Sequence, residues 1–219
     1  MSLYRDMKGA RVISIASRRG AGATTRSAGS MFGKGLSDRA MKKLSKKFGK
    51  PVSETDFRNR ALFLVMSSTG LRAKEILSLK FTDKIESPEG DILFRYLRKG
   101  GNLAFAVISG EALGSVKKYH ETFGIESDHF FVTLPVNRTK GRRMPMTTRQ
   151  LGRIVNGWNV TTGTGRPVHP HAFRHTVGQK MFDVYGSMAA QKKLGHTSPV
   201  ITSKYYTRPY YDGTDVLKW

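Results

Sequence analysis

A chain of 219 residues is long enough for one well-packed domain with short appendages. Lys and Arg number 38 against 16 Asp and Glu, so the formal net charge is +22 and nucleic acid is the expected partner. The absence of cysteine excludes disulfides, thiolate zinc sites and cysteine nucleophiles. The longest wholly apolar run, 61–66, is too short to span a bilayer, and the N-terminus lacks a signal-peptide core. We therefore expect no membrane partner and a cytoplasmic, nucleoid-associated protein, although charge alone does not separate an enzyme from a passive binder.

The first segment, 1–35, is rich in Gly, Ser, Ala and Arg and contains little that would form a core. This composition is typical of a flexible basic arm that lies along a nucleic-acid backbone or stays disordered. A phosphate-loop interpretation fails, because Gly29 and Gly33 are separated by three residues where that motif needs four.

Two helices are predicted next. Ser37 is a suitable N-cap for a helix over 36–50, whose apolar residues face inward and whose lysines face outward. These lysines are candidate contacts to DNA phosphates, although a lysine face is usually just solvated: Lys42, Lys43, Lys46 and Lys47. Ser53 or Thr55 opens the second helix, which carries an inward apolar stripe and ends at Gly70.

The residues after Gly70 place Arg72 and Glu75 three apart at the start of another helix, where they would form an ordinary surface ion pair. Further on, 91–98 and 103–109 are β-rich runs around a glycine-containing turn, which indicates a hairpin.

A helix is predicted over 111–123, a short buried strand or extended segment over 128–133, and a helix from a Thr148 cap to about Trp158. Between the last two lies a basic loop, 137–143, that we expect to contact DNA. Its candidate residues are Arg138, Lys140, Arg142 and Arg143.

The chain is organised around 169–206. Pro170 favours the first turn of a helix, in which His171 and Arg174 stand three apart on one face. The apolar residues that follow at helical spacing, Phe173, Val177, Met181 and Val184, predict a face that packs inward. Ser187 is a suitable cap for a second short helix and Gly195 for its end. A third helix, after Ser198 and Pro199, would carry Tyr205.

Two imidazoles, a guanidinium and a phenol would thus come together from His171, Arg174, His196 and Tyr205. Arginine binds phosphate oxygens with two parallel hydrogen bonds, and a deprotonated tyrosine attacks phosphorus to give a phosphotyrosine. A phosphodiester therefore fits this set as substrate. Any one of these residues alone is more often a core or surface residue than a catalyst.

The joint pattern resembles the tyrosine recombinase (phage integrase) superfamily. Its second box is His-x-x-Arg followed by Gly-His, with the nucleophilic tyrosine nine residues after that histidine, which matches His171, Arg174, His196 and Tyr205. Tyr206 is one place late and is the rival nucleophile.

The first box of the superfamily is similar to the run from Thr69 to Leu79 and makes Arg72 the second phosphate clamp, with Glu75 as its support. Two guanidiniums would stabilise the charge of a pentavalent phosphorane. The resemblance also places a catalytic lysine in the hairpin at Lys99, as the general acid for the leaving 5′ oxygen. The sequence after this turn departs from the family pattern, and Arg98 is the rival to Lys99.

The resemblance implies a mainly α fold with a small antiparallel β-sheet (α+β), the tyrosine recombinase catalytic-domain fold. It implies a catalytic domain over 36–206, in a tetramer on double-stranded DNA. The tail over 207–219 either docks on a neighbouring subunit, as in many members, or stays unpacked. Most members carry a further helical domain upstream, so the sequence corresponds to a minimal recombinase or a fragment. The implied activity is site-specific cleavage and rejoining of DNA through a 3′-phosphotyrosyl intermediate, with no metal, ATP or other cofactor.

Two alternatives stay open. A type IB topoisomerase shares this fold and chemistry but rejoins the same strand. A non-catalytic DNA-binding protein would keep the fold alone, although the presence of every basic position and of the tyrosine argues against it.

Overall fold

The computed structural model describes residues 33–87, 90, 92–98, 100–136 and 140–195. Its helices are α1 (Asp38–Phe48), α2 (Glu54–Thr69), α3 (Ala73–Ser78), α4 (Gly110–Thr122), α5 (Thr148–Asn156) and α6 (Pro170–Leu194), with a 3-10 turn η1 (Phe81–Asp83). Its strands are β1 (Lys84–Glu86), β2 (Ile92–Leu97) and β3 (Leu103–Val107). The fold is therefore mainly α with a small sheet, as predicted.

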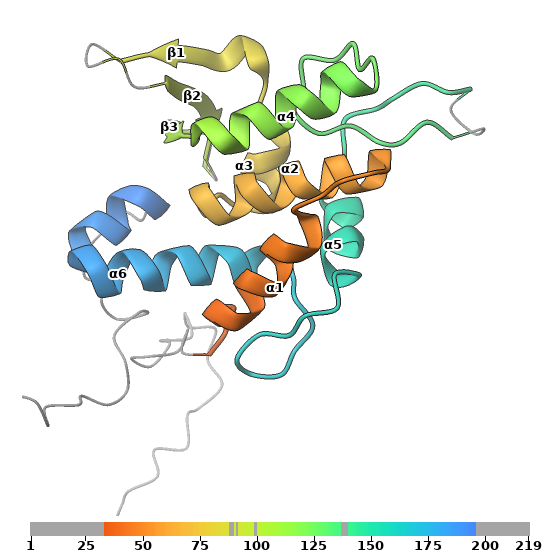
Figure 1. The fold of residues 1–219 in the computed structure, drawn as a ribbon. Helices are drawn as coiled ribbons and strands as arrows, with labels where there is room; N and C mark the ends of the chain where they lie inside the picture. Colours follow the sequence, from red (N-terminus) through yellow and green to blue (C-terminus); the bar gives the residue numbers. More distant parts are fainter. Residues whose placement is uncertain (1–32, 88–89, 91, 99, 137–139, 196–219) are drawn as a thin grey trace, which may run out of the picture.

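The helix at the centre is α2, which packs against α1, α4 and α6 (Figure 1). Buried residues follow one another along it, from Ala61 through Phe63 and again at Val65 and Met66, because neighbours cover it on several sides. Ser53 caps its start, with Asp56 returning the hydrogen bond, and Gly70 ends it with a φ of 65°. The predicted start and end of this helix are confirmed.

Gly70 is required by space as well as by φ. A Cβ atom placed there would lie 3.0 Å from the side chain of Val177 and 3.1 Å from that of Leu194. The end of α2 is thus pressed against both halves of α6, and this close approach brings the two predicted boxes of the sequence together.

The sheet is antiparallel, in the order β1-β2-β3, and it lies beside α3 and α4 (Figure 1). The hairpin of β2 and β3 was predicted, and its register pairs Arg95 with Phe105 and Leu97 with Leu103. Phe94 and Tyr96 point inward and are buried, as the two-residue period of a strand requires. Strand β1 was not predicted, because three residues, all of them exposed, are too few to carry a periodic signal.

The long helix α6 consists of two segments. Gly186 has φ 77° and ψ −176°, so the helix breaks there, and the second segment ends at Gly195 with φ 62°. The predicted start at Pro170 and end at Gly195 are confirmed. The predicted inward position of Val184 is wrong: its side chain is 61% exposed, because the chain turns at Gly186 and the returning segment packs near Val177 instead.

Two further differences are small. The cap of α5 is Thr147 rather than Thr148, since the Thr147 hydroxyl accepts the hydrogen bond of the Gln150 amide. Residues 128–133 are buried as expected at Phe130, Phe131 and Val132 but form isolated β-bridges and no regular strand.

Candidate active site

Among the predicted catalytic residues that the structure describes, Arg174 is the most deeply buried, with 2% of its surface exposed. Its Nη1 donates to the Gly70 carbonyl at 2.9 Å and its Nη2 to the Leu194 carbonyl at 2.6 Å. These are the last carbonyls of two helices, which the helix itself leaves without partners. Arg174 therefore ties the end of α2 and the end of α6 to the first segment of α6, and the position of its guanidinium is set by both.

Arg72 caps α3 and is held by Glu75. The Glu75 carboxylate accepts from the Arg72 backbone amide at 2.8 Å and from its Nη1 at 2.9 Å. Glu75 is 3% exposed, whereas about a third of the Arg72 side chain remains accessible. The predicted pair is present, and it orients one edge of the guanidinium.

A cavity of about 590 Å³ lies between α3 and the β2–β3 hairpin. Arg72 and Glu75 line it from α3, and Arg98, Gly100 and Gly101 line it from the hairpin turn. Both glycines have positive φ, 97° and 82°, as this tight turn requires. Lys99 lies outside the described residues, so its predicted role stays a prediction.

Arg98 directly follows β2, and its side chain lies against the C-terminal end of α6. A Cβ atom placed on Gly195 would be 2.8 Å from the Arg98 Cζ, so the guanidinium rests directly on the glycine. The same glycine follows Leu194, whose carbonyl accepts from Arg174. Arg98 and Arg174 are thus brought to one place by the end of α6.

Tyr96 is buried in strand β2, and the charged residues of this region affect the pKa of its phenol. Burial raises the pKa of Tyr96, and the negative charge of Glu75 raises it further. The positive charges of Arg98, Arg174 and Arg72, in this order, oppose that rise. Arg72 and Arg98 line the same cavity, and Arg98 and Arg174 both contact the end of α6. We call Arg72, Arg98 and Arg174 the arginine cluster.

His171 is exposed on the first turn of α6, and its ring centroid lies 4.4 Å from that of His175. His175 is 5% exposed; burial, helped by the charges of His171 and Lys34, lowers its pKa to about 3. His175 is therefore neutral at ordinary pH and packs against the ring of His171, one helical turn before it. The sequence analysis did not single it out, although its spacing of four from His171 was a usable signal.

The remaining predicted catalytic residues, His196 and Tyr205, lie outside the described residues, as do Tyr206 and the tail. The last described residue, Gly195, lies in the arginine cluster. In the part of the chain that the structure describes, no cluster of His, Asp and Glu suits a metal ion.

The predicted DNA-contacting lysines of α1 are all exposed: Lys42, Lys43, Lys46 and Lys47. Two of them reach across to the turn after α5, where the Lys47 Nζ donates to the Trp158 carbonyl at 3.3 Å and the Lys43 Nζ to that of Asn159 at 3.5 Å. Their role toward DNA stays a prediction.

The basic residues of the predicted loop differ in their exposure and in their partners. Lys140 and Arg142 are exposed, whereas the Arg143 side chain is 18% exposed and forms a two-pronged ion pair with Glu54 of α2, with Nη2 at 3.2 Å from Oε2. Arg143 therefore has a structural partner within the domain. Arg138 lies outside the described residues.

None of the described helices is long and apolar enough to cross a membrane.

Comparison with known proteins gives a consistent result. The model of the phage integrase family matches residues 36–212. The tyrosine recombinase XerC of Chromobacterium violaceum is 31% identical over 156 residues, which cover 70% of this chain and 49% of that protein. The chain spans about half the length of the curated relatives that it matches.

Two solved structures share the fold. The crystal structure of XerA recombinase superposes with a TM-score of 0.62 at 23% identity, covering 84% of this chain and 65% of that one. The XerH site-specific recombinase bound to its difH substrate, in a pre-cleavage complex, gives a TM-score of 0.60 at 22% identity and covers 84% of this chain and 52% of that one.

Proposed function

The chain belongs to the phage integrase family, and we propose that it is a site-specific DNA recombinase that cleaves and rejoins strands through a 3′-phosphotyrosyl intermediate. The observation that carries this proposal is the arginine cluster: Arg72 and Arg98 line one cavity, and Arg98 and Arg174 both contact the end of α6. Such a convergence of guanidiniums suits a phosphodiester, whose charge grows as the phosphorane forms. Relatives and structural neighbours named as recombinases support it.

In the proposed first step, the Tyr205 phenol oxygen attacks phosphorus and its proton passes to a neighbouring base. The bond from phosphorus to the 5′ oxygen breaks as the new bond forms, and Lys99 gives a proton to the departing oxygen. Arg72 and Arg174 hold the two non-bridging oxygens, while His171 and His196 orient the phosphate and manage protons. The second step reverses the first: a 5′ hydroxyl of another strand attacks phosphorus and releases the tyrosine.

The close contact at Gly195 supports the proposed role of His196. His196 follows Gly195 directly in the sequence, and Gly195 rests on Arg98. Glu75 has an orienting role, because it fixes Arg72 by two hydrogen bonds.

The proposal includes the arrangement of the whole chain. Residues 36–206 form the catalytic domain, 1–35 a basic arm, and 207–219 a tail that docks on a neighbouring subunit of a tetramer on double-stranded DNA. The exposed basic residues of α1 and of the 140–142 loop would contact phosphates, and their effect would weaken with salt.

The experiment is incubation with a nicked suicide substrate carrying the native recombination site, in EDTA, followed by a denaturing gel. A protein–DNA band that disappears in Tyr205→Phe and persists in Tyr206→Phe is the expected result. Absence of the band on a validated site would overturn the proposal in favour of DNA binding alone. Relaxation of supercoiled plasmid without site-dependent strand exchange would favour a topoisomerase.

A further inference from the structure

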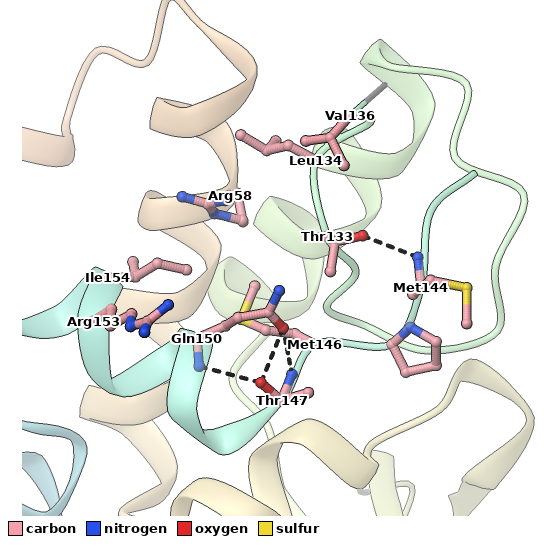
Figure 2. A pocket seen from close by; sticks show the side chains of 11 residues that line it. Arg58, Thr133, Leu134, Val136, Met144, Met146, Thr147, Gln150, Arg153 and Ile154 are labelled. Atoms are coloured by element: carbon pink, nitrogen blue, oxygen red, sulfur yellow. Dashed lines mark hydrogen bonds between the residues drawn. The ribbon is translucent and has the colours of Figure 1, made fainter. Parts of the chain in front are cut away.

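A second cavity, of about 570 Å³, lies away from the arginine cluster, between α2, α5 and residues 133–136 and 144–147 (Figure 2). It shares no lining residue with the cavity at Arg72. We call it the Arg58 groove, and eleven residues line it: Arg58, Thr133, Leu134, Val136, Met144, Pro145, Met146, Thr147, Gln150, Arg153 and Ile154.

One wall of the Arg58 groove is apolar and adaptable. Leu134 and Met146 lie along it, and Val136 and Met144 stand at its edge with 49% and 52% of their surfaces exposed. Methionine side chains are flexible and polarisable, so they fit apolar partners of different shape. Exposed apolar residues that continue a cavity wall are typical of a binding surface.

The opposite wall carries a buried positive charge. Arg58 is 7% exposed, and its Nε has no hydrogen-bond partner among the described residues, while its Nη2 donates to the Asn59 side chain at 3.2 Å. The charge of Glu54 acts on Arg58, but the Glu54 carboxylate is paired with Arg143 and forms no ion pair with Arg58 among the described residues. A buried guanidinium without an ion pair of its own carries a desolvation cost that an incoming anion would offset.

A second guanidinium stands on the same side. Arg153 of α5 lines the groove next to Ile154, is exposed, and forms no ion pair in the described part of the chain (Figure 2). None of the eleven lining residues is acidic. The groove therefore has two cations on one side, an apolar wall on the other, and Thr147 and Gln150 between them.

We infer that the Arg58 groove binds an acidic, apolar segment of a partner protein, with an Asp or Glu carboxylate between Arg58 and Arg153 and an adjoining Leu- or Phe-like side chain against Met144 and Met146. The apolar wall disfavours a DNA backbone, which offers phosphates and small sugars and no large apolar side chain to place there. The exposed Val136 and Met144 extend the surface beyond what a small carboxylate ligand would cover. Charge complementarity and apolar contact together thus select a peptide segment.

The test uses the full chain and fluorescein-labelled twelve-residue peptides in which one Glu stands between a Leu and a Phe at spacings of one to four, each paired with a Gln-substituted copy. Fluorescence anisotropy measures binding. At least one Glu peptide is expected to bind about tenfold more tightly than its Gln copy, the worth of a charged hydrogen bond. Arg58→Met and Arg153→Gln are each expected to remove this preference.

Arg149→Gln is the matched control, because Arg149 is an exposed arginine of the same helix that does not line the groove. It should leave binding unchanged. In protein with ¹³C-methyl methionine, the signals of Met144 and Met146 should shift with the Glu peptide.

Equal binding of the Glu and Gln peptides, or equal loss in Arg149→Gln, would overturn the inference, since it would reflect general attraction to a chain of charge +22. If Arg58→Met and Arg153→Gln weaken duplex DNA binding and leave peptide binding intact, the groove contacts DNA instead. If Arg153→Gln abolishes self-association measured by sedimentation, the occupant is a second copy. The peptide assay requires no DNA cleavage, so its failure is distinct from failure of the recombinase proposal.

Discussion

Two buried arginines of this domain occupy opposite environments. Arg174 donates to two helix-terminal carbonyls and lies with Arg98 at the end of α6. Arg58 is almost as buried, yet one of its nitrogens has no described partner and its cavity is largely apolar. Burial alone therefore does not show that an arginine stabilises the fold. Arg174 satisfies two backbone carbonyls, whereas Arg58 is buried with one nitrogen lacking a described partner.

The sharpest test of this contrast replaces each arginine with methionine, which has a similar length and no charge. Arg174→Met leaves the Gly70 and Leu194 carbonyls without a donor, so the free energy of unfolding should fall by about 3 kcal/mol. Arg58→Met removes a poorly satisfied charge, and the change should stay within about 1 kcal/mol. Urea unfolding measures both.

The same pair separates the two sites by activity. DNA cleavage by Arg174→Met should fall at least about a thousandfold, as expected when a phosphate clamp is lost. A large loss of stability in Arg58→Met, or none in Arg174→Met, would contradict the comparison.

A second prediction concerns the neutral histidine behind Arg174. The unfolded chain takes up a proton on His175 near pH 6.5, whereas the folded protein does so only near pH 3. The unfolded state therefore binds more protons in this window. The stability from His175 is fully present above pH 6.5 and is lost as the pH falls towards 3, by at most about 1.4 kcal/mol per pH unit.

Urea unfolding at pH 7, 6, 5 and 4 measures this slope. His175→Gln has no proton to take up, so its stability should fall less steeply with acid than that of the wild type. Parallel slopes would mean that the imidazole is not held neutral by the fold.

A third prediction tests the close contact within the arginine cluster. Gly195→Ala introduces a Cβ atom 2.8 Å from the Arg98 Cζ, at a φ of 62°. Gly124 is a matched control, since its φ is 56° and nothing lies within 4 Å of an added Cβ. Both variants carry the strain of the left-handed conformation, about 1–2 kcal/mol.

Gly195→Ala should cost about 1 kcal/mol more than Gly124→Ala, because the Arg98 side chain must move. It should also slow DNA cleavage, which Gly124→Ala should not. Equal unfolding energies and equal cleavage rates would show that Arg98 adjusts at no cost and that its position is unimportant.

Much of this fold was accessible from the sequence because its signals are local. The caps at Ser37, Ser53, Gly70 and Gly195 depend on a few neighbouring residues, and the hairpin on glycines in its turn. The exposure of Val184 was not accessible, because it depends on where the segment after Gly186 packs.

The site shows the same division. The two boxes supplied Arg72 and Arg174, whereas the burial of His175 and the contact of Arg98 with Gly195 arise from packing between distant segments. The pairing of Arg143 with Glu54 is of this kind too, since 89 residues separate them. A basic loop predicts its charge but not which charges have partners inside the domain.

The smallest expected effects are those of a substitution in the basic loop on the stability of the domain and on peptide binding in the Arg58 groove. Arg143→Gln removes the ion pair with Glu54, whose side chains are each 18% exposed, and should lower the free energy of unfolding by about 1 kcal/mol. The released Glu54 carboxylate is then free to turn towards Arg58, on which its charge already acts. Binding of the Glu peptide should therefore weaken about threefold, by competition from within the chain.

Lys140→Gln, on the exposed part of the loop, should instead leave peptide binding unchanged and reduce the salt dependence of DNA binding by about one phosphate contact. If Arg143→Gln behaves like Lys140→Gln in both assays, Arg143 faces DNA as the sequence predicted, and the groove owes its open charge to something other than this ion pair.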